Sequence, residues 1–111
     1  MTEKFSFRVD AQLRLALLAG CGCQKRRALL EADARRAGLT GAEIDAAARG
    51  RSFDARTAIV LEYARTLIEG GEREINRSRL RAARLGLDAE DLAEVENKVA
   101  RILSEAAADD L

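Results

Sequence analysis

The sequence contains no proline, no histidine and no tryptophan, and only 4% of its residues are aromatic. Proline interrupts helices, so its absence leaves long helical stretches unbroken. The rest of the composition, 48% hydrophobic with many Ala and Leu and 34% charged, is typical of helix rather than of strand or disorder. A length of 111 residues suits one domain with one hydrophobic core. We therefore expect an all-α fold and a single domain spanning residues 1–111.

An excess of charge of either sign is also missing, because 19 basic residues balance 19 acidic ones. The arginines are spread among acids, as on a solvated or ion-paired helix face, so no basic field that would hold nucleic acid is visible. No apolar run reaches the roughly 20 residues that cross a bilayer. The first residues, MTEKFSF, lack the pattern of a signal peptide. We expect no nucleic-acid partner, no membrane association and a cytoplasmic location.

The pattern of apolar residues, caps and glycines predicts about five to six helices. Residues 1–9 carry Phe5 and Phe7 without a helix start signal, so we expect an extended arm there that packs across a subunit boundary. Asp10 is then the expected cap of a first helix over residues 10–20. A second helix is expected from Cys23 to Ala37, with Cys23, Leu30, Ala34 and Ala37 along one apolar stripe that faces the core.

Three further junctions have recognisable caps. Thr40 and Glu43 form the pattern of a capping box before a short helix that ends near Gly50. Asp54 is the expected N-cap of a long central helix, with an apolar stripe at Val60, Leu61, Ala64, Leu67 and Ile68. A helix is expected over residues 75–85, followed by a last one that Asp88 caps and that turns Leu103 inward with its other apolar residues. Residues 106–111 are expected to fray.

The only two cysteines, Cys21 and Cys23, lie one residue apart at a helix junction. In a reducing cytosol such a pair is more typical of free thiols, a redox pair or a metal site than of a structural disulfide. A helix N-terminus and nearby cations favour the reactive thiolate, and Lys25, Arg26 and Arg27 follow Cys23. The alternative is that both cysteines only fill a tight corner between helices, since cysteine is often buried.

The run LALLAGCGCQKRRALLEADARRAGLTGAEIDAAARG, followed by FDARTAIVLEYARTLIEG, resembles the core of the AhpD-like, or carboxymuconolactone decarboxylase, family. In that family a helix leads into a Cys-x-x-Cys-x-x-x-His motif, the motif helix ends in Ala-Gly-Leu, and a short capped helix and a long helix follow. The resemblance implies a helical bundle of AhpD type, a homo-oligomer, and an antioxidant alkylhydroperoxidase or disulfide oxidoreductase that a thiol reductant protein serves.

The catalytic motif itself is degenerate. Aligned without gaps, the family's first cysteine falls on Cys23, its second on Arg26 and its histidine on Leu30. A gapped alternative places the two motif cysteines on Cys21 and Cys23. The lactone decarboxylase branch also depends on histidine, so decarboxylation is not expected.

The candidate catalytic residues are therefore Cys23 as the attacking thiol, Cys21 as the resolving thiol, and Arg26 beside the thiolate. Arg26 and Arg27 also have a simpler interpretation as exposed residues paired with Glu31 or other acids. No cofactor and no metal are expected. The activity that the resemblance implies is weakened or lost, and the alternatives are a non-catalytic oligomeric scaffold or interaction protein, or a small-molecule binder.

Overall fold

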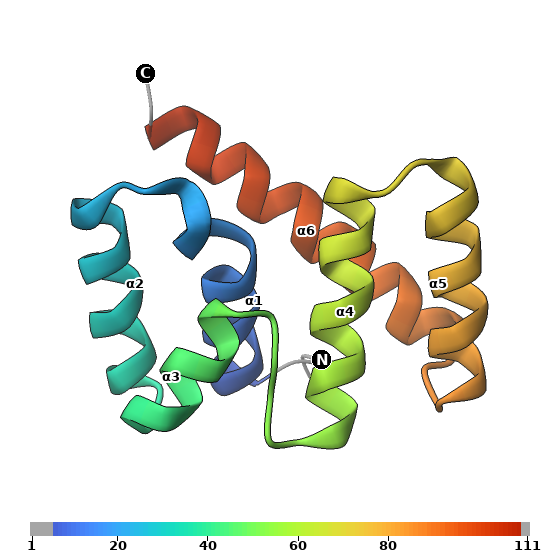
Figure 1. Ribbon diagram of the computed structural model, residues 1–111, viewed down its shortest axis with the longest axis horizontal. Helices are drawn as coiled ribbons and strands as arrows, with labels where there is room; N and C mark the ends of the chain where they lie inside the picture. The colour runs from blue at the N-terminus through green and yellow to red at the C-terminus, as the bar shows by residue number, and fades with distance from the viewer. Residues whose placement is uncertain (1–5, 110–111) are drawn as a thin grey trace.

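The computed structural model describes residues 6–109, which form a bundle of six α-helices and one 3-10 turn, with no strand over this range (Figure 1). The expected all-α class is confirmed. None of the helices in this range is both long and apolar enough to span a bilayer. The elements are α1 (Phe7–Leu18), the 3-10 turn (Ala19–Cys21), α2 (Gln24–Arg36), α3 (Gly41–Ala48), α4 (Ala55–Glu69), α5 (Glu72–Arg84) and α6 (Ala89–Asp109).

The first helix begins earlier than the sequence suggested. Ser6 is its N-cap, and the Ser6 hydroxyl accepts a hydrogen bond from the backbone N–H of Val9 at 3.3 Å. The expected arm over residues 1–9 is therefore wrong for residues 7–9, which form the first helical turn. Phe5 lies outside the described residues. Asp10, the expected cap, lies inside α1, where it pairs with Arg14 one turn later.

The last helix extends further than expected. Residues 106–109 belong to α6 rather than to a frayed tail, and residues 110–111 lie outside the described range. Two arginines of other helices hold these final turns. Arg14 of α1 pairs with Glu105 at 2.8 Å, and Arg26 of α2 donates to the carbonyl oxygen of Ala106 at 3.3 Å. These contacts join residues far apart in the sequence, so no local sequence pattern could predict them.

The capping predictions are confirmed at α3 and α4. The Thr40 hydroxyl accepts from the N–H of Glu43 at 3.2 Å, and the Glu43 carboxylate accepts from the N–H of Thr40 at 2.9 Å. The hydrogen bond from the Thr40 backbone lowers the pKa of Glu43. The Asp54 carboxylate accepts from the N–H of Thr57 at 2.8 Å, and this bond lowers the pKa of Asp54.

Asp88 also acts as the expected cap, through a reciprocal pair with Asp91. Asp88 Oδ1 accepts from the N–H of Asp91 at 2.8 Å, and Asp91 Oδ2 accepts from the N–H of Asp88 at 3.0 Å. Asp91 is buried, with only 3% of its surface exposed, and Arg56 of α4 lies 2.9 Å from its other oxygen. The start of α6 is thereby fixed against α4.

The buried apolar residues form two clusters instead of the single expected core, and α1 contributes to both. The corner cluster joins α1 to α2 and α3, and consists of Ala11, Leu15, Ala19, Leu30, Ala34, Leu39, Ile44 and Ala47. The long-helix cluster joins α1 to α4, α5 and α6, and consists of Leu13, Ala16, Val60, Leu61, Tyr63, Ala64, Ala82, Leu87, Val95, Val99 and Ile102.

Two apolar residues expected inside are exposed. Ile68 keeps 41% of its surface exposed in the last turn of α4, and Leu103 keeps 39%. Leu103 follows the buried Ile102, and one step along an α-helix turns the side chain by about 100° away from the buried face. The predicted apolar stripe on α4 is confirmed at Val60, Leu61 and Ala64, which are all buried.

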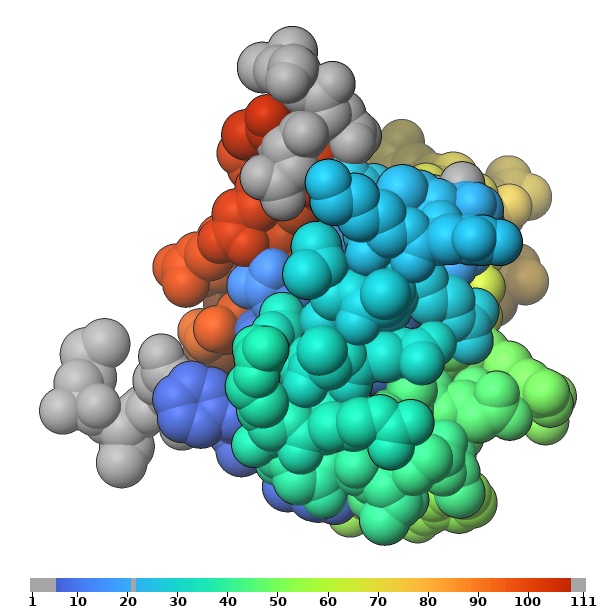
Figure 2. All heavy atoms as spheres, turned by 90° about the vertical axis from the view of Figure 1, so that its left-hand side faces the viewer, coloured from blue at the N-terminus to red at the C-terminus, as the bar shows by residue number. Residues whose placement is uncertain are grey.

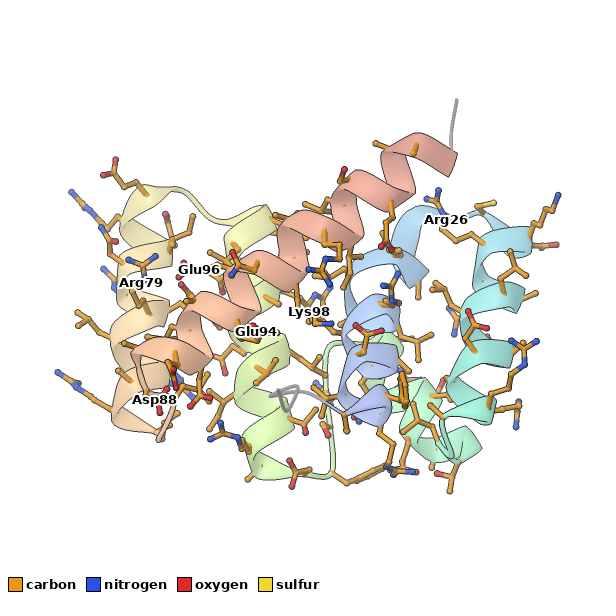
Figure 3. All side chains as sticks on the ribbon, turned by 180° about the vertical axis from the view of Figure 1, so that it is seen from behind. Arg26, Arg79, Asp88, Glu94, Glu96 and Lys98 are labelled. Atoms are coloured by element: carbon orange, nitrogen blue, oxygen red, sulfur yellow. The ribbon has the colours of Figure 1, made fainter. Side chains whose placement is uncertain are left out.

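A polar contact among three helices holds α5 in place. The buried Tyr63 of α4 donates its hydroxyl hydrogen to Glu96 of α6, and Arg79 Nε of α5 donates to the Tyr63 oxygen at 3.1 Å. Arg79 also pairs with Glu96 at 3.0 Å, and Figure 3 shows these two side chains facing each other between α5 and α6. Burial, followed by the bond to Glu96, raises the pKa of Tyr63.

Candidate functional site

A groove of about 560 Å³ lies between the start of α2 and the C-terminal turns of α6, and residues of α1 also line it. Figure 2 faces this side of the molecule, with the end of α6 next to the start of α2. Apolar and charged residues share the lining, which consists of Arg14, Leu18, Cys23, Lys25, Arg26, Leu29, Leu30, Asp33, Ile102, Glu105 and Ala106.

Cys23 is among the residues that line this groove and is the N-cap residue of α2, so the helix begins at Gln24, one position later than expected. Its carbonyl oxygen accepts the first helical hydrogen bond, from the N–H of Arg27 at 3.0 Å. The cysteine is exposed, carries a free thiol and makes no capping bond with its sulfur. The prediction that Cys23 belongs to the buried stripe of α2 is wrong, whereas Leu30 and Ala34 of that stripe are buried.

The exposure of Cys23 follows from the turn before it. Gly22 has φ +82°, in the left-handed region that a residue without Cβ adopts most readily. This conformation ends the 3-10 turn and directs the chain into α2. Cys21 contributes its backbone to the 3-10 turn, and its side chain lies outside the described part of the structure. The pairing of Cys21 with Cys23 therefore stays a prediction.

Arg26 lies in the same groove as Cys23, in the first turn of α2. Its guanidinium donates to the carbonyl oxygen of Ala106, and Figure 3 shows it beside the end of α6. Arg26 therefore links α2 to α6. Its neighbour Arg27 pairs with Glu31 at 2.9 Å, which is the ion pair that the spacing suggested.

A row of alternating charges joins α1 to α6 beside the groove, and the sequence had not indicated it. Arg14 pairs with Glu105 and, at 2.9 Å, with Asp10, while Lys98 lies 3.7 Å from the other oxygen of Asp10. Burial opposes the charged form of Arg14, but the hydrogen bonds to Glu105 and Asp10 outweigh it and raise the pKa of Arg14. The Asp10 and Arg14 pair has helical spacing in the sequence, but its partners on α6 come from tertiary packing.

A thiol and several cationic side chains line the groove, and its two carboxylates form ion pairs. Both carboxylates in the lining pair with arginine: Glu105 with Arg14, and Asp33 with Arg36 at 2.7 Å. Leu30, the position at which the resemblance implied a histidine, is buried within the corner cluster. The arrangement therefore favours nucleophilic exchange at sulfur over chemistry that needs a neutral base.

Comparison of the chain with models of protein families, with curated proteins and with solved structures found no match.

Proposed function

We propose that this chain is an AhpD-like helical domain whose remaining chemistry is thiol–disulfide exchange at Cys23, with the peroxidase activity of the family weakened or lost. The observation that carries the proposal is the exposed thiol of Cys23 at the N-terminal end of α2, on the edge of the groove. A helix N-terminus and a nearby cation stabilise negative charge, and Lys25 lines the same groove.

The order of the helices supports the family part of the proposal. The helix that Cys23 begins runs to Arg36 and is followed by Ala37, Gly38 and Leu39. The short helix α3, with its capping box at Thr40, and the long helix α4, capped by Asp54, come next. This is the succession that the resemblance implies for the residues after the motif cysteine.

The exchange reaction needs only the two thiols of the chain and a disulfide substrate. The Cys23 thiolate attacks one sulfur of the substrate, forms a mixed disulfide, and releases the other sulfur as a thiolate. The Cys21 thiolate then attacks Cys23, which forms the Cys21–Cys23 disulfide and releases the second substrate thiolate. The substrate gains two electrons and the cysteine pair loses them. A thiol reductant protein, the partner that the resemblance implies, returns the pair to dithiol by the same steps in reverse.

Peroxide reduction also needs a proton donor for the leaving group, and we find no such donor among the groove residues. Breaking the O–O bond releases an alkoxide or hydroxide, a poor leaving group that a positioned acid must protonate. A thiolate is stable near neutral pH and leaves without such help. Because the chain contains no histidine and the carboxylates of the groove are paired with arginine, we propose disulfide exchange in preference to peroxidase chemistry.

The test compares Cys21→Ser and Cys23→Ser with the unchanged chain in reaction with oxidised glutathione, followed by intact-mass measurement. Cys21→Ser should accumulate the mixed disulfide, because nothing resolves it, whereas Cys23→Ser should react at least about tenfold more slowly. Lys25→Gln should slow the first step, and Arg51→Gln, which removes an exposed cation outside the groove lining, serves as the matched charge control. Equal rates for Cys23→Ser and the unchanged chain would contradict the proposal.

A second candidate, an oligomeric scaffold without catalysis, rests on a different observation. Large apolar side chains are exposed on several helices and turns, with 80% of Phe7, 74% of Phe53 and 61% of Leu29 open to solvent. Such residues favour self-association. We propose a homo-oligomer built on dimers or trimers, and a monomeric mass in light scattering at micromolar concentration would contradict it. Self-association together with an inert Cys23 would favour the scaffold.

A further inference from the structure

The outer face of α5 carries a set of charges that the fold does not use. Residues three or four positions apart share one face of an α-helix, and Arg73, Arg77, Leu80 and Arg84 follow this spacing. We call these four residues the outer α5 face. All four are exposed, whereas Ala82, on the opposite side of the helix, has only 2% of its surface exposed. Figure 1 shows α5 at the edge of the molecule, with its inner side toward α4 and α6.

The arginines of α5 fall into two groups. Arg79 and Arg81 flank the face and pair with acids of neighbouring helices, Arg79 with Glu96 and Arg81 with Glu62 at 3.2 Å. Arg73, Arg77 and Arg84 form no ion pair with any residue between positions 6 and 109. The balance of acids and bases expected from the sequence thus does not extend to α5, which carries five arginines and two glutamates, and its outer face carries no acid at all.

This face is unfavourable for the isolated helix. Like charges one turn apart on a helix destabilise it, and Arg73 and Arg77 have this spacing. Leu80, between the arginines, is 63% exposed and packs into neither apolar cluster. None of the four side chains is buried, whereas a partner with negative charge around an apolar group would compensate for all of them.

We propose that the outer α5 face binds an acidic segment of a protein partner, in which carboxylates flank an apolar side chain. A guanidinium group binds a carboxylate through two parallel hydrogen bonds, and arginine is preferred over lysine in such contacts. Leu80 supplies the apolar contact between these charges. From Arg73 to Arg84 the helix rises roughly 16 Å, the length of about three turns of a partner helix.

The same observations argue against nucleic acid as the partner. The chain as a whole has no net charge, so the long-range attraction that drives phosphate binding is missing. A phosphate backbone also offers no counterpart to Leu80. Glu72 and Glu74, at the start of α5, would repel an extended polyanion but leave room for a short acidic segment that lies along the arginines.

The experiment measures fluorescence polarisation of a labelled synthetic peptide of about 14 residues, with glutamates at helical spacing around one leucine. The unchanged chain should bind it saturably. The triple variant Arg73→Gln, Arg77→Gln and Arg84→Gln should weaken binding by about tenfold or more. Leu80→Ser should weaken it as well. The matched control replaces three exposed arginines elsewhere, Arg35, Arg51 and Arg101, by Gln and should bind within about twofold of the unchanged chain.

Several outcomes would overturn the proposal. These are equal loss in the control triple, equal binding of a peptide with Gln in place of Glu, tighter binding of a DNA duplex at the same ionic strength, or no saturable binding. Removal of like charges should leave the melting temperature of the α5 triple variant unchanged or slightly higher. Loss of binding with an intact melting transition then identifies the face itself, independently of any reactivity of Cys23.

Discussion

Tyr63 is the one tyrosine of a chain without tryptophan, and its hydroxyl lies between Glu96 and Arg79 where three helices meet. Burial and the bond to Glu96 favour the neutral phenol, so the pKa of Tyr63 in the folded chain lies above its ordinary value of 10.0. Absorbance at 295 nm follows this single group without interference. We expect its ionisation in the folded chain above pH 10, and in urea at the ordinary value.

The raised pKa of Tyr63 also predicts how the stability of the fold changes with pH. Because the folded pKa is raised, the contribution of Tyr63 to stability is complete below the unfolded value and is lost as the pH rises through the folded pKa. Tyr63→Phe should remove this alkaline loss, and it should cost about 1 kcal/mol at neutral pH for the missing hydrogen bonds. An unshifted titration in the folded chain would contradict the contact among Tyr63, Glu96 and Arg79.

At the scale of a single element, the N-terminus of α4 depends on Asp54, whose carboxylate accepts from both the N–H and the hydroxyl of Thr57. Asp54→Ala should lower the free energy of unfolding by about 1 kcal/mol, the usual value of an N-cap. Asp54→Asn keeps an acceptor at the cap and should lose less. Urea unfolding followed by circular dichroism measures both, and equal losses would show that capping by the side-chain oxygen is not what stabilises the start of α4.

The pH dependence separates these two variants further. The pKa of Asp54 is lowered below its ordinary 3.8, so its contribution is present above that value and is lost as the pH falls through the lower, folded pKa. The unchanged chain should therefore lose stability on acidification below about pH 4 more steeply than Asp54→Asn, which has no carboxylate at the cap. Parallel acid unfolding curves for the two chains would contradict the role of the charged group.

Local chemistry also explains which elements could be predicted from the sequence. The caps at Thr40, Asp54 and Asp88 act over three residues, so their pattern is complete in the sequence itself. The start of α1 was missed although Ser6 is a good N-cap, because Phe5 and Phe7 suggested an apolar arm instead. The stability of the final turns of α6 depends on Arg14 and Arg26, and only the packed chain brings these residues to that end.

The candidate site could be predicted only in part, for the same reason. The position of Cys23 at the start of a helix follows from the glycines before it and the helical pattern after it. The groove itself arises where α2 meets α6, far apart in the sequence, and so does the engagement of Arg26 by Ala106. Residue spacing thus predicted the position of the Cys23 thiol but not the α6 residues that line the groove with it.

For the molecule as a whole, the long-helix cluster sets the stability. Leu61 is fully buried in it, and Leu61→Ala should lower the free energy of unfolding by about 2 to 5 kcal/mol, because the neighbouring helices cannot fill the cavity that remains. Ile68→Ala, on the same helix but largely exposed, is the matched control and should change stability by less than about 1 kcal/mol. Similar losses in urea unfolding would show that the buried side of α4 is misassigned.

The membership of α1 in both clusters has a consequence for the order of events during synthesis. As the ribosome releases the chain, the segment from α1 through α3 emerges before α4, and this segment, with its connecting turns, holds every residue of the corner cluster. The opposite side of α1, with Leu13 and Ala16, has no partner until α4 and α6 have been made. A nascent chain that stops after α3 therefore leaves this apolar strip exposed to water, and chaperones recognise such surfaces. Docking of α4 and α6 onto the already folded segment from α1 to α3 is then the step that buries this apolar strip.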